Sequence, residues 1–360
     1  MYSHCRGYMF CVPTDSLVQV TYLGDDKRFS GVTGWSTGQG SGNLPRGLTD
    51  YIGSRITNED MKIRLFRLLE AIEISIKYDN DIEARSGKSK DGTVLRIFVA
   101  PEFYFRPAMR CEDLGGTYTK TEFLALFDVL KYCFENYDTW GKGTKPLRDW
   151  VFLCGTCVLN ESDKRLMMRN TMPAYEIDKK GKVYPREISK MAISNIDGMP
   201  SYFSFTSSNS ALVKNHFFSK LGLFVEICLE HGLGVLVNSK YLKSTKVAVI
   251  CAAGMPYKKE SMKKNVLVYR NDGMRYINRE LMCNISLRTP DDKTRELMTE
   301  IVGVITNPWS DLNTESTYVP SVFPEAESTA VLALTNVPKQ PRVLGPGDYF
   351  YPAVLTQKTR

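Results

Sequence analysis

Cys228 is the residue whose type and position point most directly to chemistry. It ends the apolar stretch Leu221–Cys228, which is typical of a buried strand. In open α/β sheets ligands bind beyond the carboxyl ends of the strands. A thiol at that edge can be both exposed and electrostatically tuned, as a nucleophile must be. Because most free cysteines are instead buried and inert, the prediction depends on the residues that accompany Cys228.

Two further side chains, Glu102 and Lys190, end a predicted strand or hairpin. Glu102 follows the apolar run Val94–Ala100 and is flanked by Phe103, so partial desolvation would raise the pKa of its carboxyl group and make it a usable base. Lys190 is informative only in combination, because its ammonium group would favour a thiolate and stabilise an oxyanion. Glu102, Lys190 and Cys228 therefore supply a base, an electrostatic stabiliser and a nucleophile for acyl transfer.

An α/β sheet is the element that must position these residues. Amphipathic periodicity predicts helices over Asn58–Tyr78 and Thr121–Tyr137. Because strands alternate with helices, we predict an α/β fold. A Gly- and Ser-rich surface loop is expected over Phe29–Leu48. The predicted strands are Ser16–Leu23, Val94–Ala100, Trp150–Leu159, Thr171–Ile177, Gly181–Ile188, Leu221–Cys228, Lys246–Ala253 and Asn265–Asn271.

Composition narrows the class of protein. The chain has 360 residues, of which 43% are hydrophobic and 24% charged, and a net charge of +7 spread too evenly for a nucleic-acid surface. Nine irregularly spaced cysteines favour reduced thiols and a cytoplasmic location. We expect no secretory signal, no membrane segment and no membrane partner. No linker forces a boundary, so we predict an N-terminal segment (1–15), a main domain (16–275) and a C-terminal extension (276–360) packed on it.

The order of the three residues, each in its local context, resembles the carbon–nitrogen hydrolase (nitrilase) superfamily. The resemblance spans residues 16 to 275 and comprises three motifs. Val99–Phe103 is similar to the family's strand-Pro-Glu motif, Asn170–Lys190 to its segment of Asn-Thr, turn, strand and Lys, and Gly222–Glu230 to its nucleophile strand.

The resemblance implies a nitrilase-like α-β-β-α sandwich, four layers when two subunits pair, with a C-terminal extension. It implies hydrolysis of a non-peptide carbon–nitrogen bond (amide, carbamoyl or nitrile) in a small molecule, through a thioester or thioimidate on Cys228. Lys190 and the backbone N–H of Leu229 would hold the oxyanion, and Glu102 would activate water. It implies neither metal nor organic cofactor, and a homodimer or higher homo-oligomer. Further candidate oxyanion or substrate contacts are Phe103, Tyr104, Glu230 and His231.

One departure from the family pattern lies between the lysine and the cysteine. Many members carry a second glutamate there that helps to position the substrate, whereas the only acidic residue between Met191 and Val225 is Asp197. Glu226 adjoins the nucleophile strand's end but should point to the opposite face by the alternation of a strand. We therefore expect an altered pocket.

Two alternatives remain open on sequence grounds, and a third is set aside. Cys228 could pair with His216 or His231 as a thiol protease. The fold could also serve a non-catalytic binding protein, since fold does not fix function. The pair Cys154 and Cys157 has C-x-x-C spacing, but it falls inside a predicted strand, so we interpret both as core cysteines rather than a redox or zinc pair.

Overall fold

The computed structural model describes residues 4–11, 44–86, 94–106, 117–141, 146–161, 168–192, 210–255, 258–262, 266–275, 281–287, 304–306, 342–345, 348–351 and 357–358. The predicted strand Ser16–Leu23 and most of the predicted loop Phe29–Leu48 lie outside these residues. The end of that predicted loop forms helix α3 (Arg46–Arg55) instead.

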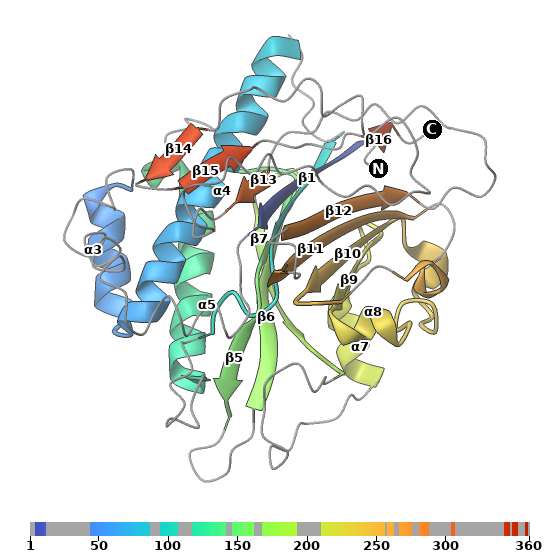
Figure 1. Cartoon of the computed structure of the whole chain (residues 1–360). Helices are drawn as coiled ribbons and strands as arrows, with labels where there is room; N and C mark the ends of the chain where they lie inside the picture. The colour runs from blue at the N-terminus through green and yellow to red at the C-terminus, as the bar shows by residue number, and fades with distance from the viewer. Residues whose placement is uncertain are drawn as a thin grey trace.

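The described strands form two sheets (Figure 1). The order of the larger sheet is β14 (Arg342–Gly345), β15 (Asp348–Tyr351), β13 (Val304–Thr306), β1 (His4–Cys11), β2 (Val94–Ala100), β4 (Trp150–Cys154), β6 (Met168–Ile177), β5 (Cys157–Asn160) and β3 (Tyr118–Thr119), with β16 (Gln357–Lys358) beside β1 and β7 (Val183–Ser189) beside β6. The smaller sheet is β12 (Leu281–Leu287), β11 (Leu267–Arg275), β10 (Val247–Ala252), β9 (Leu223–Ile227) and β8 (Phe217–Phe218).

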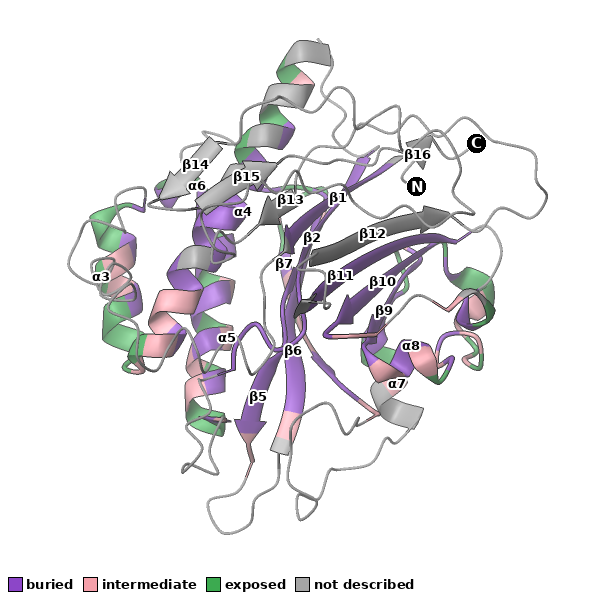
Figure 2. Ribbon diagram, viewed as in Figure 1, coloured by how far each residue is buried: buried purple, intermediate pink, exposed green. Residues whose placement is uncertain are grey.

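The central strands of both sheets are parallel and buried on both faces (Figure 2). Such strands are expected to read as continuous apolar runs, as β2 does. Ile97 and Val99 of β2 face the smaller sheet, whereas Phe98 and Ala100 face the helices. Because successive side chains of a strand point to opposite faces, β2 contributes to the core under the helices and to the core between the sheets.

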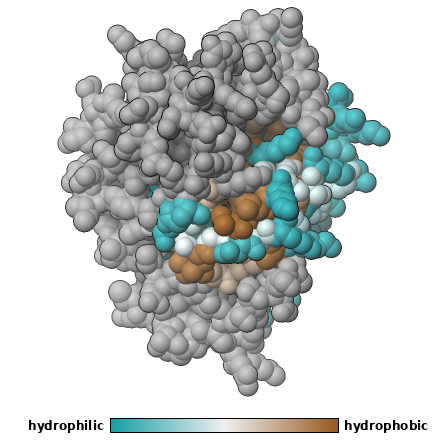
Figure 3. Space-filling view, turned by 90° about the vertical axis from the view of Figure 1, so that its right-hand side faces the viewer, coloured by the Kyte–Doolittle hydropathy of each residue, from teal (hydrophilic) through white to brown (hydrophobic). Residues whose placement is uncertain are grey.

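The layers run helix, sheet, sheet, helix. On the outer face of the larger sheet pack α4 (Glu59–Ser86) and α5 (Lys120–Glu135), with α6 (Tyr137–Trp140) after them. The short elements α7 (Ser210–His216), α8 (Leu229–Gly232), η3 (Leu242–Ser244) and η4 (Lys259–Ser261) belong to the chain around the smaller sheet. On the side of the molecule that carries α7 and α8, apolar residues are gathered between hydrophilic ones (Figure 3).

A single chain supplies all four layers. The core between the sheets is made of this chain's own side chains, such as Leu153 and Ile188 from one sheet and Val225 and Val249 from the other. The α/β sandwich itself agrees with the prediction. Four layers were expected when two subunits pair, whereas both sheets already bury their inner faces within one chain.

Strand β1 was not predicted, although it lies between β2 and β13 in the larger sheet. Its sequence HCRGYMFC contains a fully buried arginine. The charge is compensated by helix α4, since Asp79 accepts hydrogen bonds at 2.5 Å from both Arg6 and Tyr8 and also pairs with Arg96 of β2. A buried charge survives when it is paired and hydrogen-bonded, which hydrophobic periodicity does not register.

Several predicted boundaries shift. Helix α4 continues eight residues beyond the predicted end at Tyr78. The predicted strand Trp150–Leu159 is broken at Gly155, whose φ of 79° suits glycine, and its second half, β5, pairs antiparallel with β6. The described helices include none that is both long enough and apolar enough to cross a membrane.

Candidate active site

The carboxyl ends of strands from both sheets meet around one group of polar side chains. Glu102 lies two residues beyond β2, and Cys228 directly follows β9. Asn271 of the smaller sheet donates hydrogen bonds to the carbonyl oxygens of Val99 (2.8 Å) and Phe10 (3.0 Å) in the larger sheet. This buried amide joins the two sheets beside the ends from which Glu102 and Cys228 project.

The structure brings Glu102, Lys190 and Cys228 together. Nζ of Lys190 lies 2.8 Å from Oε1 of Glu102, and the two side chains are 2% and 0% exposed. Nδ2 of Asn170 donates to the same Oε1 at 2.9 Å. The carboxylate is also a hydrogen-bond partner of the Cys228 thiol. Residues that are 88 and 126 positions apart from Glu102 therefore share one buried cluster.

Electrostatics keep the Cys228 thiol protonated in this structure. Burial raises its pKa, and so do the charge of Glu102 and the hydrogen bond with that carboxylate. Lys190 and a long sulfur contact with the carbonyl oxygen of Ala253 (3.9 Å) lower the pKa, but the net shift is upward. A nucleophilic role for this thiol would require a base, and the Glu102 carboxylate is its hydrogen-bond partner.

The backbone is constrained at two points of the cluster. Cys228 has φ 50° and ψ −106°, and Phe103 has φ 61°, both rare for residues with a side chain. Tight contacts hold these conformations, since the N–H of Cys228 donates to the carbonyl oxygen of Cys251 (2.9 Å) and that of Phe103 to Oγ1 of Thr156 (2.7 Å). Strained residues of this kind gather at functional sites.

The two aromatic residues proposed as substrate contacts go to different places. The ring of Phe103 lies beside the cluster, 5.7 Å from Nζ of Lys190, and the buried guanidinium of Arg106 stacks on it at 4.8 Å. Tyr104 instead packs in the core beneath the helices and donates its hydroxyl to the carbonyl oxygen of Arg64. The structure therefore places Phe103, but not Tyr104, next to Lys190.

Glu230 and His216 are buried behind the cluster rather than in it. The two oxygens of Glu230 accept the backbone N–H groups of Met191 (2.6 Å) and Ile227 (2.7 Å), and burial raises the pKa of this carboxyl group. The ring nitrogens of His216 lie 2.9 Å and 3.0 Å from the carbonyl oxygens of Val225 and Ser189. Both side chains contact backbone groups, and both oxygens of Glu230, which was predicted as a substrate contact, accept backbone N–H groups.

His231 is likewise engaged elsewhere. Its Nδ1 lies 2.8 Å from Oε2 of Glu226, and its Nε2 accepts the backbone N–H of Lys258 at 2.9 Å. An accepting Nε2 means that Nδ1 carries the proton and donates it to Glu226. The ring therefore has no nitrogen left for substrate or for the thiol. Leu229, the remaining predicted oxyanion contact, is the first residue of the turn α8 directly after Cys228.

Two residues of the cluster were missed as candidates by sequence reasoning. The sequence pattern indicated Asn170 only as the first residue of a motif, and it gave no indication of Arg106. Asn170 could have been found from the pairing of the two predicted strands, because it lies directly opposite Lys190. No group of three or more potential metal ligands is found among the described residues. Cys154 and Cys157 are buried at a strand break, and burial raises the pKa of both thiols.

Comparison with known proteins gives weak matches only. No family model and no curated protein matches the chain. Among solved structures, it is similar to a carbon–nitrogen hydrolase from Helicobacter pylori G27, with 9% identity over 75% of this chain and 73% of that chain and a TM-score of 0.34. An amidase variant from Nesterenkonia sp. AN1, with an acetamide moiety added covalently at its active-site cysteine, matches at 8% identity over 75% and 76%, with a TM-score of 0.37.

A third match is Saccharomyces cerevisiae Nit3, described as a member of branch 10 of the nitrilase superfamily. It shares 12% identity over 58% of this chain and 74% of that chain, with a TM-score of 0.34. All three similarities are too distant to bear on activity.

Proposed function

We propose that this protein is a cysteine-dependent hydrolase of a non-peptide carbon–nitrogen bond in a small amide, carbamoyl compound or nitrile. The observation that carries the proposal is the buried Lys190–Glu102 ion pair beside the Cys228 thiol. A protonated thiol next to a carboxylate and an ammonium group is equipped for nucleophilic attack with proton transfer, followed by stabilisation of negative charge.

In the first half of the reaction with an amide, Glu102 takes the thiol proton as sulfur attacks the carbonyl carbon. The carbonyl π electrons move to oxygen, and this oxyanion is stabilised by Lys190 and the N–H of Leu229. The carbon–nitrogen bond then breaks while protonated Glu102 gives its proton to the nitrogen. Ammonia or an amine leaves, and a thioester remains on Cys228.

In the second half, water attacks the thioester carbon and Glu102 takes a proton from it. The second tetrahedral intermediate is held by the same two donors. It collapses as the carbon–sulfur bond breaks, the carboxylic acid leaves and the proton on Glu102 returns to sulfur. Atoms and charges balance, and Glu102 acts alternately as base and acid.

The alternatives receive less support from the described residues. A thiol protease needs a histidine facing the thiol, whereas the ring nitrogens of His216 and His231 contact backbone groups and Glu226. A non-catalytic binding protein would have no need for an ion pair buried against a strained cysteine. Burying an ion pair costs desolvation free energy that its own attraction often does not offset, so the pair is weak evidence for a purely stabilising role.

The test compares acid release from a panel of primary amides, carbamoyl compounds and nitriles by wild-type protein and by Cys228→Ala, Glu102→Gln and Lys190→Ala. We expect complete loss with Cys228→Ala and at least about a hundredfold loss of kcat/KM with each of the other two. Cys133→Ala, which removes a buried thiol on helix α5, is the matched control and should retain activity.

Intact-mass measurement supplies the second readout. Wild-type protein mixed with a turned-over substrate should carry an acyl adduct that peptide mapping assigns to Cys228. Circular dichroism would verify that each variant is folded, which matters for Lys190→Ala because it leaves a buried carboxylate without its partner. Acid release or adduct formation that survives in Cys228→Ala would overturn the proposal.

A further inference from the structure

Asn170 carries a buried acceptor that nothing in the described protein satisfies. The residue is 2% exposed, and its Nδ2 donates to Oε1 of Glu102 at 2.9 Å. Its Oδ1 is buried and has no hydrogen-bond partner among the described residues. Buried polar atoms in native proteins nearly always have a partner, so this oxygen calls for a donor that the described residues do not supply.

The orientation of the Asn170 amide follows from its neighbours. Oε1 of Glu102 is paired with the ammonium group of Lys190, so this oxygen is an acceptor. The Asn170 side chain must therefore approach it with its NH₂ group. Oδ1 therefore points away from that oxygen. The backbone N–H of Lys190 donates to the carbonyl oxygen of Asn170 at 2.8 Å. The two residues thus face each other across β6 and the end of β7, and their side chains lie on the same face.

We propose that Oδ1 of Asn170 accepts a hydrogen bond from the N–H of the scissile amide or carbamoyl group. This inference rests on the proposed function and narrows its substrate class. An oxygen that only accepts selects a group that donates, and a nitrile or an ester has no N–H to offer. The substrate class is therefore an N–H-bearing amide or carbamoyl compound rather than a nitrile.

The proposed contact also explains how one side chain serves the reaction twice. Nδ2 of Asn170 holds the carboxylate that moves the proton, and Oδ1 would hold the nitrogen that receives it. The leaving nitrogen is thereby kept next to Glu102 with its N–H bound and its lone pair available. Such alignment accelerates proton transfer to the leaving group.

The test separates substrate binding from mere support of Glu102. Primary amides of short aliphatic and aromatic acids are compared with the methyl esters of the same acids, using wild-type protein and Asn170→Ala. We expect kcat/KM to fall roughly ten- to a hundredfold more for the amides than for the matched esters, because an ester has no N–H group to donate to Oδ1. Asn238→Ala, at an exposed asparagine, is the matched control and should change neither.

A binding measurement on an inactive background gives the second arm. In Cys228→Ala, calorimetry should show tighter binding of the primary amide than of the nitrile with the same chain. The double variant Cys228→Ala/Asn170→Ala should lose that preference. Where Asn170→Ala is poorly folded by circular dichroism, Asn170→Ser replaces it, because its hydroxyl can still donate to Glu102.

The outcomes distinguish this inference from the proposed function. An equal fall for amides and esters, or wild-type turnover of nitriles as fast as amides, would leave Cys228 chemistry intact but overturn the role of Oδ1. Absence of Cys228-dependent acid release from every amide and ester would overturn the proposed function, and this inference with it.

Discussion

At the scale of single residues, the site balances two opposite charges around one thiol. Glu102 raises the pKa of Cys228, whereas Lys190 lowers it, and burial adds to the upward shift. The net result is a resting thiol rather than a thiolate. Because only the thiolate is strongly nucleophilic, a cysteine kept protonated should react slowly with electrophiles.

This balance predicts opposite effects on alkylation and on turnover. In Glu102→Gln the negative charge is gone and Lys190 remains, so the pKa of Cys228 should fall and iodoacetamide should modify it about tenfold faster at pH 8, although hydrolysis is lost. In Lys190→Ala the pKa should rise and alkylation should slow. Peptide mass spectrometry of Cys228 across pH 7 to 10 compares the alkylation rate of each variant with that of the wild-type protein.

Cys133 in the same digests is the internal control, because it lies on α5 away from both charges and its rate should be unchanged. The idea is contradicted if Glu102→Gln slows alkylation of Cys228 at every pH. That result would mean that the carboxylate does not act on the thiol through its charge.

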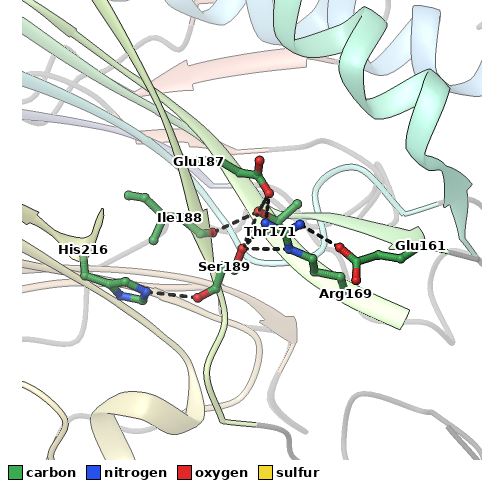
Figure 4. A network of polar contacts seen from close by, with 7 residues as sticks. All are labelled: Glu161, Arg169, Thr171, Glu187, Ile188, Ser189 and His216. Carbon is green, nitrogen blue, oxygen red and sulfur yellow. Dashed lines mark hydrogen bonds and ion pairs between the residues drawn. The ribbon is translucent and has the colours of Figure 1, made fainter. Parts of the chain in front are cut away.

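At the scale of elements, two buried side chains fix the end of β7 against the end of β9. Glu230 accepts N–H groups from Met191 and Ile227, one on each side of this junction. His216 bridges the same junction through the carbonyl oxygens of Ser189 and Val225. Figure 4 shows Ser189 held from the other direction as well, by Arg169 through its hydroxyl. Lys190 therefore projects from a backbone that is held on both sides.

Glu230→Gln tests this junction. The glutamine side chain has one acceptor oxygen and one NH₂ group, so it can accept only one of the two backbone N–H groups and leaves the other buried and unpaired. The negative charge that lies 3.5 Å from His216 is also lost. We expect the free energy of unfolding to fall by about 2 kcal/mol or more, with a lower kcat and a nearly unchanged KM. Denaturation in urea and steady-state kinetics provide the measurements.

The exposed Glu260→Gln is the matched control for this change of charge. The positioning role is refuted if Glu230→Gln loses stability while kcat stays at the wild-type value. In that case the junction would stabilise the fold without orienting Lys190.

At the same scale, the predicted strands can be compared with those of the structure. The strands Val94–Ala100, Thr171–Ile177 and Gly181–Ile188 were predicted closely, because hydrophobic pattern and turn residues are local signals. Strand β1 was missed because its buried Arg6 depends on Asp79, a partner 73 residues away. The break at Gly155 was missed because the hydrophobic character continues across it while the backbone turns.

For the site, sequence reasoning selected Glu102, Lys190 and Cys228, which the structure places together. It did not foresee that His231 and Glu230 would be consumed by backbone contacts, because proximity in sequence to Cys228 does not reveal which way a side chain points in a short helical turn. Nor did it identify Asn170 as a member of the cluster, although the register of the two strands places Asn170 opposite Lys190.

At the scale of the whole molecule, the four-layer arrangement buries thiols both between the two sheets and under the helices of the larger sheet. Six described cysteines are buried and free: Cys5, Cys133, Cys154, Cys157, Cys228 and Cys251. Burial raises the pKa of each of these thiols, to about 12 for Cys5. In the unfolded chain each would titrate at about 8.5.

Folding stability should therefore fall as pH rises above about 8.5, since the unfolded state then loses thiol protons that the folded state keeps. Each buried thiol contributes up to about 1.4 kcal/mol per pH unit once its unfolded form is ionised. Guanidinium denaturation with a phosphine reductant at pH 7, 8, 9 and 10 measures the slope. Cys154→Ala removes one such thiol. Whatever the free energy of unfolding of this variant at pH 7, it should fall less steeply with pH than that of the wild-type protein, by about 1.4 kcal/mol per pH unit. An unchanged slope in this variant would show that the Cys154 thiol ionises equally in both states, and hence that the core around it admits water.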